Sequence, residues 1–113
     1  MMLTIDKSGP FPVAKMTGEW RATDGHEYRD ELHPLVATAG AKLAIDLSGL
    51  HLIDSSGLAV LINVVTHARL ANARVILVAP SPFIAGVFEV TRLNTWFDIC
   101  RDLGEAAKLL RGG

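Results

Sequence analysis

The sequence lacks most features of exported, membrane-spanning or nucleic-acid-binding proteins. Its one cysteine, Cys100, cannot form a disulfide within the chain, so we expect a protein of a reducing compartment, the cytoplasm. Eleven lysines and arginines against twelve aspartates and glutamates give no basic excess that would hold a phosphate backbone, which argues against nucleic-acid binding. The longest near-continuous apolar stretch, 58–65, is far shorter than the roughly 20 residues of a membrane span. Residues 1–10 also do not form a signal peptide.

The composition is that of a folded domain. Half of the 113 residues are hydrophobic and 20% are charged, a balance that excludes a disordered chain. The length predicts a single domain, 1–113. A domain this small has much surface for its volume, so some apolar side chains must reach the surface or a partner. The oligomeric state is left open, and a homo-oligomer is one of the outcomes that the composition allows.

Turn residues divide the chain into alternating strand and helix patterns. The expected strands are 3–6, 11–17, 42–47, 74–78 and 96–99. The expected helices are 23–39, 56–71, 82–90 and 102–110. The order β-β-α-β-α-β-α-β-α predicts an α/β fold with a mostly parallel sheet and an antiparallel first strand at its edge.

Several local signals refine these elements. Pro34 predicts a kink or two helical pieces, because its ring clashes with the preceding turn. Asp24 and Glu27 have the spacing of an N-terminal cap. The dipeptide Ser48-Gly49 is expected to end the third strand, and Ser81 is expected to cap the third helix. The second helix is expected to bury the stripe Leu58, Leu61, Ile62 and Val65. In the third helix one face carries Phe83, Val87 and Val90.

The segment 46–58 is the most informative for function. It is expected to join a buried strand to a helix by a polar loop, with Ser55 and Ser56 at the helix start beside Asp46 and Asp54. Helix N-termini attract anions, including a phosphate esterified to a serine. One interpretation is ordinary capping of the helix. The other is a serine whose modification adds about −1.5 to −2 charges and switches a protein interface.

The same residues carry a resemblance. The stretch Ile45-Asp46-Leu47-Ser48-Gly49-Leu50, followed by Ile53-Asp54-Ser55-Ser56-Gly57-Leu58, resembles the signature of STAS-domain proteins, in particular the bacterial anti-sigma factor antagonists. Thr17-Gly18-Glu19 resembles that family's Gly-Glu turn, and Ser81-Pro82 resembles the opening of its third helix. The element order agrees with this family over nearly the whole chain, so the resemblance implies a single STAS domain.

The resemblance implies a regulatory protein, not an enzyme, and one without a cofactor. Such proteins bind an anti-sigma factor that is also a serine kinase, and so release a sigma factor for transcription. The kinase phosphorylates the serine that matches Ser55, with Ser56 as second choice; phosphorylation blocks binding, and a PP2C-type phosphatase reverses it. The expected partner-binding residues are Glu19, Asp46, Asp54, Ser55, Ser56, Gly57, Leu58, Val60 and Val64. For Val60 and Val64, packing inside the domain is the alternative.

Other functions fit the sequence less well. Arg21 stands where the family often has an acidic residue, and Ala59 stands where it usually has glycine. Because of these differences, a stressosome-like scaffold and a STAS subunit of a lipid-transport complex are kept as alternative functions. A small serine hydrolase is a distant alternative, because the Gly-x-Ser-x-Gly elbow is missing. No metal site is expected from His26, His33, His51 and His67, although His51 could make a contact in its loop. Cys100 is expected in the core.

Overall fold

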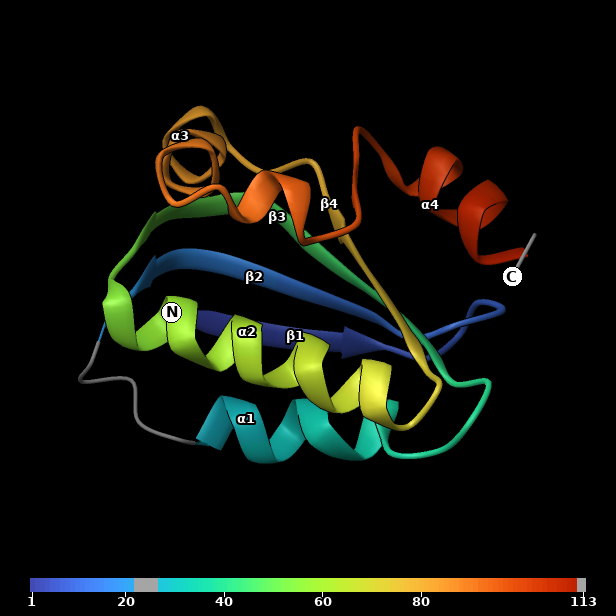
Figure 1. Ribbon diagram of the computed structural model, residues 1–113. Helices are drawn as coiled ribbons and strands as arrows, with labels where there is room; N and C mark the ends of the chain where they lie inside the picture. Colours follow the sequence, from blue (N-terminus) through green and yellow to red (C-terminus); the bar gives the residue numbers. More distant parts are fainter. Residues whose placement is uncertain (22–26, 112–113) are drawn as a thin grey trace.

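The computed structural model describes residues 1–21 and 27–111, and in this part of the chain the strands form one five-stranded sheet in chain order (Figure 1). The strands are β1 (Met2–Asp6), β2 (Val13–Trp20), β3 (Lys42–Ile53), β4 (Arg74–Val78) and β5 (Ile99–Cys100). β1 pairs antiparallel with β2, and the remaining neighbours pair parallel. The predicted α/β fold with an antiparallel edge strand is confirmed.

Helices cover both faces of this sheet. The helical elements are α1 (Glu27–Leu32), η2 (His33–Val36), α2 (Ser55–Leu70), α3 (Pro82–Val90), η3 (Leu93–Thr95) and α4 (Leu103–Arg111). α1 and α2 lie side by side on one face, where the larger core cluster forms, and α4 covers the other face (Figure 1). Among the described residues, no helix has the length and apolar character needed to cross a membrane.

The region around Pro34 forms two helical pieces, as predicted. α1 ends at Leu32, and Pro34 lies in the 3-10 turn η2, where its missing N–H leaves no α-helical hydrogen bond unmade. Asp24, and with it the cap proposed for Asp24 and Glu27, lies outside the described residues.

β3 is longer than predicted. The expectation that Ser48-Gly49 ends this strand was wrong, because β3 continues beside β2 as far as Ile53. The register with β2 shifts twice along this stretch, and such irregularities accommodate residues that local propensity would place in a turn. A Cβ atom on Gly49 would lie 2.7 Å from Cγ2 of Thr17, so the glycine lets the two strands approach.

The second half of β3 has a strand neighbour on one side only. β4 ends at Val78, opposite Asp46, so within the described residues 47–53 pairs with β2 alone. α3 lies along the other side, and the Ser81 hydroxyl donates to the carbonyl oxygen of Leu50 at 2.6 Å. A helix thus covers the strand edge. Ser81 is the N-terminal cap residue of α3, as predicted, but its side chain makes no capping hydrogen bond and is bonded to β3 instead.

The buried face of α2 differs from the predicted stripe, and α3 buries residues for which no burial was predicted. The buried residues of α2 are Gly57, Leu61, Val64, Val65 and Ala68, whereas Leu58 and Ile62 of the predicted stripe are only half-buried. α3 buries Ile84 and Phe88. Phe83, Val87 and Val90 share one face, as predicted; Phe83 and Val90 are exposed and Val87 is half-buried.

The C-terminal part of the chain follows its predicted order with shorter elements. The predicted strand 96–99 is instead a turn followed by the two-residue strand β5. Phe97 packs edge-on against Phe88, with ring centroids 5.1 Å apart. Asp102 caps α4, because its side chain accepts the backbone N–H of Glu105 at 2.8 Å.

Candidate functional site

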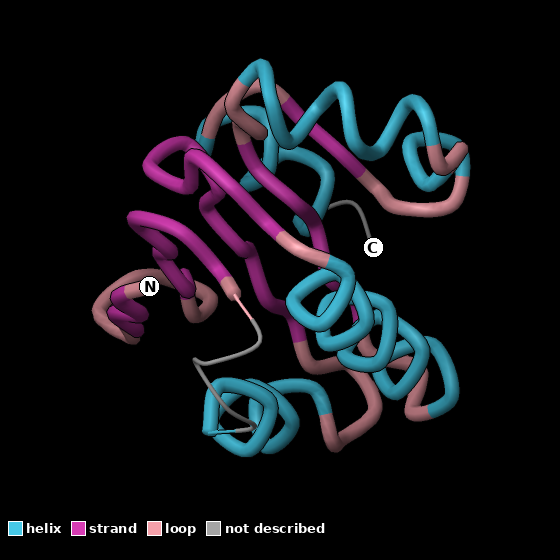
Figure 2. Tube along the Cα trace, turned by 90° about the vertical axis from the view of Figure 1, so that its left-hand side faces the viewer, coloured by secondary structure: helices cyan, strands magenta, loops and turns pink. Residues whose placement is uncertain are grey.

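The candidate site lies where β2 and β3 end and α2 begins. Trp20 and Ile53 are register partners at the ends of the two strands, and the N–H of Asp54 donates to the carbonyl of Trp20 at 3.0 Å. Glu19 lies one residue before, opposite Leu52. Figure 2 views the molecule from this end, with the start of α2 toward the viewer. The site therefore occupies the carboxyl end of parallel strands, where α/β proteins place their functional groups.

Asp54 forms the N-terminal cap of α2. Its Oδ1 atom accepts the backbone N–H groups of Ser56 and Gly57, both at 3.0 Å. Ser55 and Ser56 are exposed, and neither side chain forms a hydrogen bond within residues 1–21 and 27–111. Capping therefore explains Asp54 but gives no role to the two serine hydroxyls.

A close contact fixes the position of the first turn of α2. Trp20 is 1% exposed, and a Cβ atom on Gly57 would lie 2.8 Å from Cγ of Trp20 and 2.9 Å from Cγ1 of Ile53. Only a glycine lets the helix backbone lie this close to the indole ring. Gly57 thus sets how Ser55 and Ser56 are presented to solvent, although it is itself buried.

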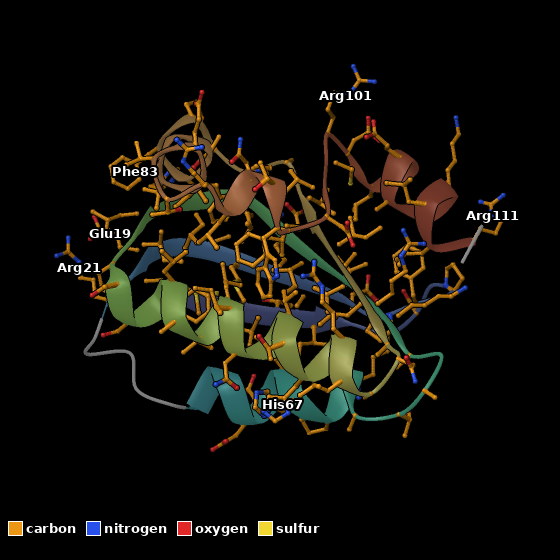
Figure 3. All side chains as sticks on the ribbon, viewed as in Figure 1. Glu19, Arg21, His67, Phe83, Arg101 and Arg111 are labelled. Atoms are coloured by element: carbon orange, nitrogen blue, oxygen red, sulfur yellow. The ribbon has the colours of Figure 1, made fainter. Side chains whose placement is uncertain are left out.

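Charges of both signs surround the serines. The α2 N-terminus contributes partial positive charge from its backbone N–H groups. The exposed side chains of Glu19 and Arg21 form an ion pair, with Nε of Arg21 2.8 Å from Oε2 of Glu19. Figure 3 shows this pair at the same end of the molecule as the start of α2. A phosphate on Ser55 would add about −1.5 to −2 charges next to Asp54, at the end of the molecule where this pair lies.

The structure brings together most of the predicted partner-binding residues. Two of them are elsewhere. Asp46 lies in the middle of β3, opposite Lys15 and Val78, and at about 3.3 Å per strand residue it is on the order of 20 Å from Ser55. Val64 is 0% exposed and belongs to the core. The prediction that these two residues lie at the site was wrong; the remaining ones are Glu19, Asp54, Ser55, Ser56, Gly57, Leu58 and Val60.

No role at the site was found for the described histidines or for the cysteine. His51 is exposed on β3 and not in a loop, and His26 lies outside the described residues. The rings of His33 and His67 are 4.3 Å apart, and Figure 3 shows His67 where α2 faces α1. Residues 1–21 and 27–111 contain no cluster of three side chains that could hold a metal ion. The buried Cys100 thiol donates to the Asp102 carbonyl at 3.3 Å, and its pKa is raised by burial and then by the charge of Glu105.

An apolar groove on α3 was not predicted as part of a site. It has a volume of about 420 Å³ and is lined by Pro82, Phe83, Gly86, Val87, Val90 and Thr91. We call this surface the α3 groove. The spacing of Phe83, Val87 and Val90 was visible in the sequence, but nothing in it indicated that this face points outward.

Comparisons with known proteins agree with this architecture. Residues 3–105 match the family described as "Mlab, STAS domain". The chain is 26% identical over 107 residues to "Putative anti-sigma factor antagonist BtrV" of Bordetella bronchiseptica, covering 95% of this chain and 92% of that protein. The anti-sigma factor antagonist SpoIIAA in its unphosphorylated form has a TM-score of 0.78 at 19% identity, over 99% of this chain and 98% of that one. The Bacillus cell fate determinant SpoIIAA in the phosphorylated form has a TM-score of 0.73 at 19% identity, over 96% and 99%.

The two SpoIIAA structures have the same fold as this chain. The family match includes the ends of β2 and β3 and the start of α2, which form the candidate site. The chain belongs to the STAS domain family.

Proposed function

We propose that this chain is an anti-sigma factor antagonist that is switched by phosphorylation of Ser55. The observation that carries the proposal is that the serines at the start of α2 are exposed and do not cap the helix. Asp54 alone caps the helix, so the exposed Ser55 hydroxyl is not needed for the fold and is accessible to a kinase. The similarity to BtrV, and the existence of SpoIIAA in phosphorylated and unphosphorylated forms, support this function.

The switch acts through charge. In the unmodified chain, Ser55 and Ser56 present neutral hydroxyls that a partner surface can approach closely. A phosphate on Ser55 adds negative charge next to Asp54 and near Glu19, so a partner that fits the neutral surface loses affinity through repulsion and the cost of desolvating the phosphate. The partner is an anti-sigma factor with serine kinase activity, a PP2C-type phosphatase removes the phosphate, and this chain acts as a binding protein without catalysis of its own.

The test uses ATP and the anti-sigma factor kinase encoded in the same genome. We expect wild type and Ser56→Ala to gain about 80 Da, one phosphoryl group, and Ser55→Ala to gain none. In calorimetry, Ser55→Ala should bind the kinase as wild type does, and Ser55→Asp should bind about tenfold or more weakly. Labelling of Ser55→Ala to the wild-type level would show that Ser55 is not the phosphorylated residue. A wild-type chain that neither binds nor is labelled would instead favour a STAS scaffold or transport-complex subunit.

A further inference from the structure

The α3 groove is an apolar surface that the fold itself leaves uncovered. α3 is anchored by Ile84 and Phe88, which are fully buried. On the opposite side, Phe83 is 53% exposed and Val90 is 86% exposed. Large apolar side chains that line one depression, in contrast to scattered single ones, mark interaction surfaces. Their spacing places them on one face over two helical turns.

Gly86 forms part of the groove and has no role in the fold that requires a glycine. A Cβ atom at this position would meet no atom within 4 Å, and its backbone is not in the left-handed region. A glycine inside a helix costs about 0.5–1 kcal/mol relative to alanine. The structure therefore carries a destabilising residue whose effect is to leave space in the groove, between Phe83 and Val90.

The dimensions of the groove decide what can occupy it. Phe83 and Val90 are about 10 Å apart along the helix axis. A stable interface buries roughly 800 Å² on each partner, which two turns of one helix cannot supply. The groove alone is therefore too small to hold a second copy of this chain. If a partner docks here, it must also bind the surface next to the groove.

The adjacent surface is the end of the molecule that carries Ser55. Ser81, just before α3, is bonded to Leu50 of β3, and this strand runs on to Asp54 and the start of α2. Figure 3 shows Phe83 on the same side of the molecule as Glu19 and Arg21. A partner bound over the serines is thus close enough to cover α3 as well.

We propose that the α3 groove receives an apolar helix of the anti-sigma factor, so that this partner covers Ser55 and α3 together. The inference rests on the function proposed above. A helix is favoured over an extended segment because this face of α3 offers apolar side chains and not the row of free N–H and C=O groups of a strand edge, so the occupant must satisfy its own backbone hydrogen bonds. Phe83 and Val90 then lie on either side of a ridge of the partner helix, and Gly86 gives that ridge room to approach.

The test measures calorimetric affinity for the same anti-sigma factor kinase. Gly86→Leu fills the groove and Val90→Asp makes it polar, and each should weaken binding about tenfold or more. Gly86→Leu should not lower the midpoint of thermal unfolding, since leucine is a better helix former than glycine and the new side chain meets open space. The matched control is Leu70→Asp, which changes an 80% exposed leucine at the other end of α2 and should leave binding unchanged.

Two failures can be told apart. If wild type binds the kinase and both groove variants bind equally well, the α3 groove is not part of the interface, while the function of Ser55 stands. If wild type does not bind, the proposed function and this inference are both rejected. Sedimentation of the free chain gives a third outcome: a dimer that Val90→Asp dissociates would assign the groove to a second copy and overturn the inference.

Discussion

Gly57 packs against the indole ring of Trp20 so closely that a single added carbon would overlap it. Its Cβ atom would be 2.8 Å from Cγ of Trp20, which is itself fully buried. The last residue of β2 therefore sets the position of the first turn of α2, and with it the presentation of Ser55. Two segments far apart in the sequence build the site through this contact.

Gly57→Ala should destabilise the protein by about 1–3 kcal/mol, because Trp20 or Ile53 must move to accept the methyl group. Gly86→Ala is the matched control. The same change in an open position should raise the free energy of unfolding by up to about 1 kcal/mol. Urea unfolding of both variants tests the contrast; equal effects at the two glycines would mean that the Trp20 contact does not constrain α2.

Asp54→Ala should lower the free energy of unfolding by about 0.5–2 kcal/mol, because the N–H groups of Ser56 and Gly57 lose their acceptor. Asp54→Asn keeps a side-chain oxygen as acceptor, so its free energy of unfolding should fall much less. Hydrogen exchange at the amides of Ser56 and Gly57 reports the cap directly. Unchanged exchange in Asp54→Ala would show that another group caps the helix.

Ser81→Ala should cost about 1 kcal/mol or more, because the carbonyl of Leu50 loses its donor at the covered edge of β3. The effect should be local to α3, seen as faster hydrogen exchange there while α4 keeps its protection. The control is Thr95→Ala, which removes an exposed hydroxyl bonded only to the carbonyl of Arg92 in a local turn. If α3 exchanged at the wild-type rate in Ser81→Ala, the hydroxyl would not be what holds it to β3.

Cys100 should react slowly with iodoacetamide in the folded protein, because burial raises its pKa and the thiolate is the reactive form. The folded state keeps the thiol proton more tightly than the unfolded chain does. The stability that this proton contributes is therefore present at neutral pH and decreases above about pH 8.5, where the unfolded thiol ionises. Cys100→Ala should lack this decrease. If the unfolding free energies of wild type and Cys100→Ala changed equally between pH 8 and pH 10, the raised pKa of Cys100 would be contradicted.

Local patterns predicted the element order and the edge position of β1, since each strand and helix carries its own apolar period and turn residues. They failed at Ser48-Gly49, where the local preference for a turn is overridden by pairing with Thr17 and its neighbours in β2. They also assigned no buried face to α3, because a helix of which every face is rich in apolar residues does not reveal which face is buried. Phe88 is buried in the core, where Phe97 packs edge-on against it.

The sequence by itself determined that two serines and an aspartate open a helix after a buried strand, because capping residues and apolar periods act over a few neighbouring positions. Only the tertiary structure decided which residues share that surface. Pairing with β2 extends β3 and carries Asp46 away from Ser55, and packing against the sheet encloses Val64. The same packing turns Val90 outward. These outcomes depend on contacts between distant segments, and no local pattern contains them.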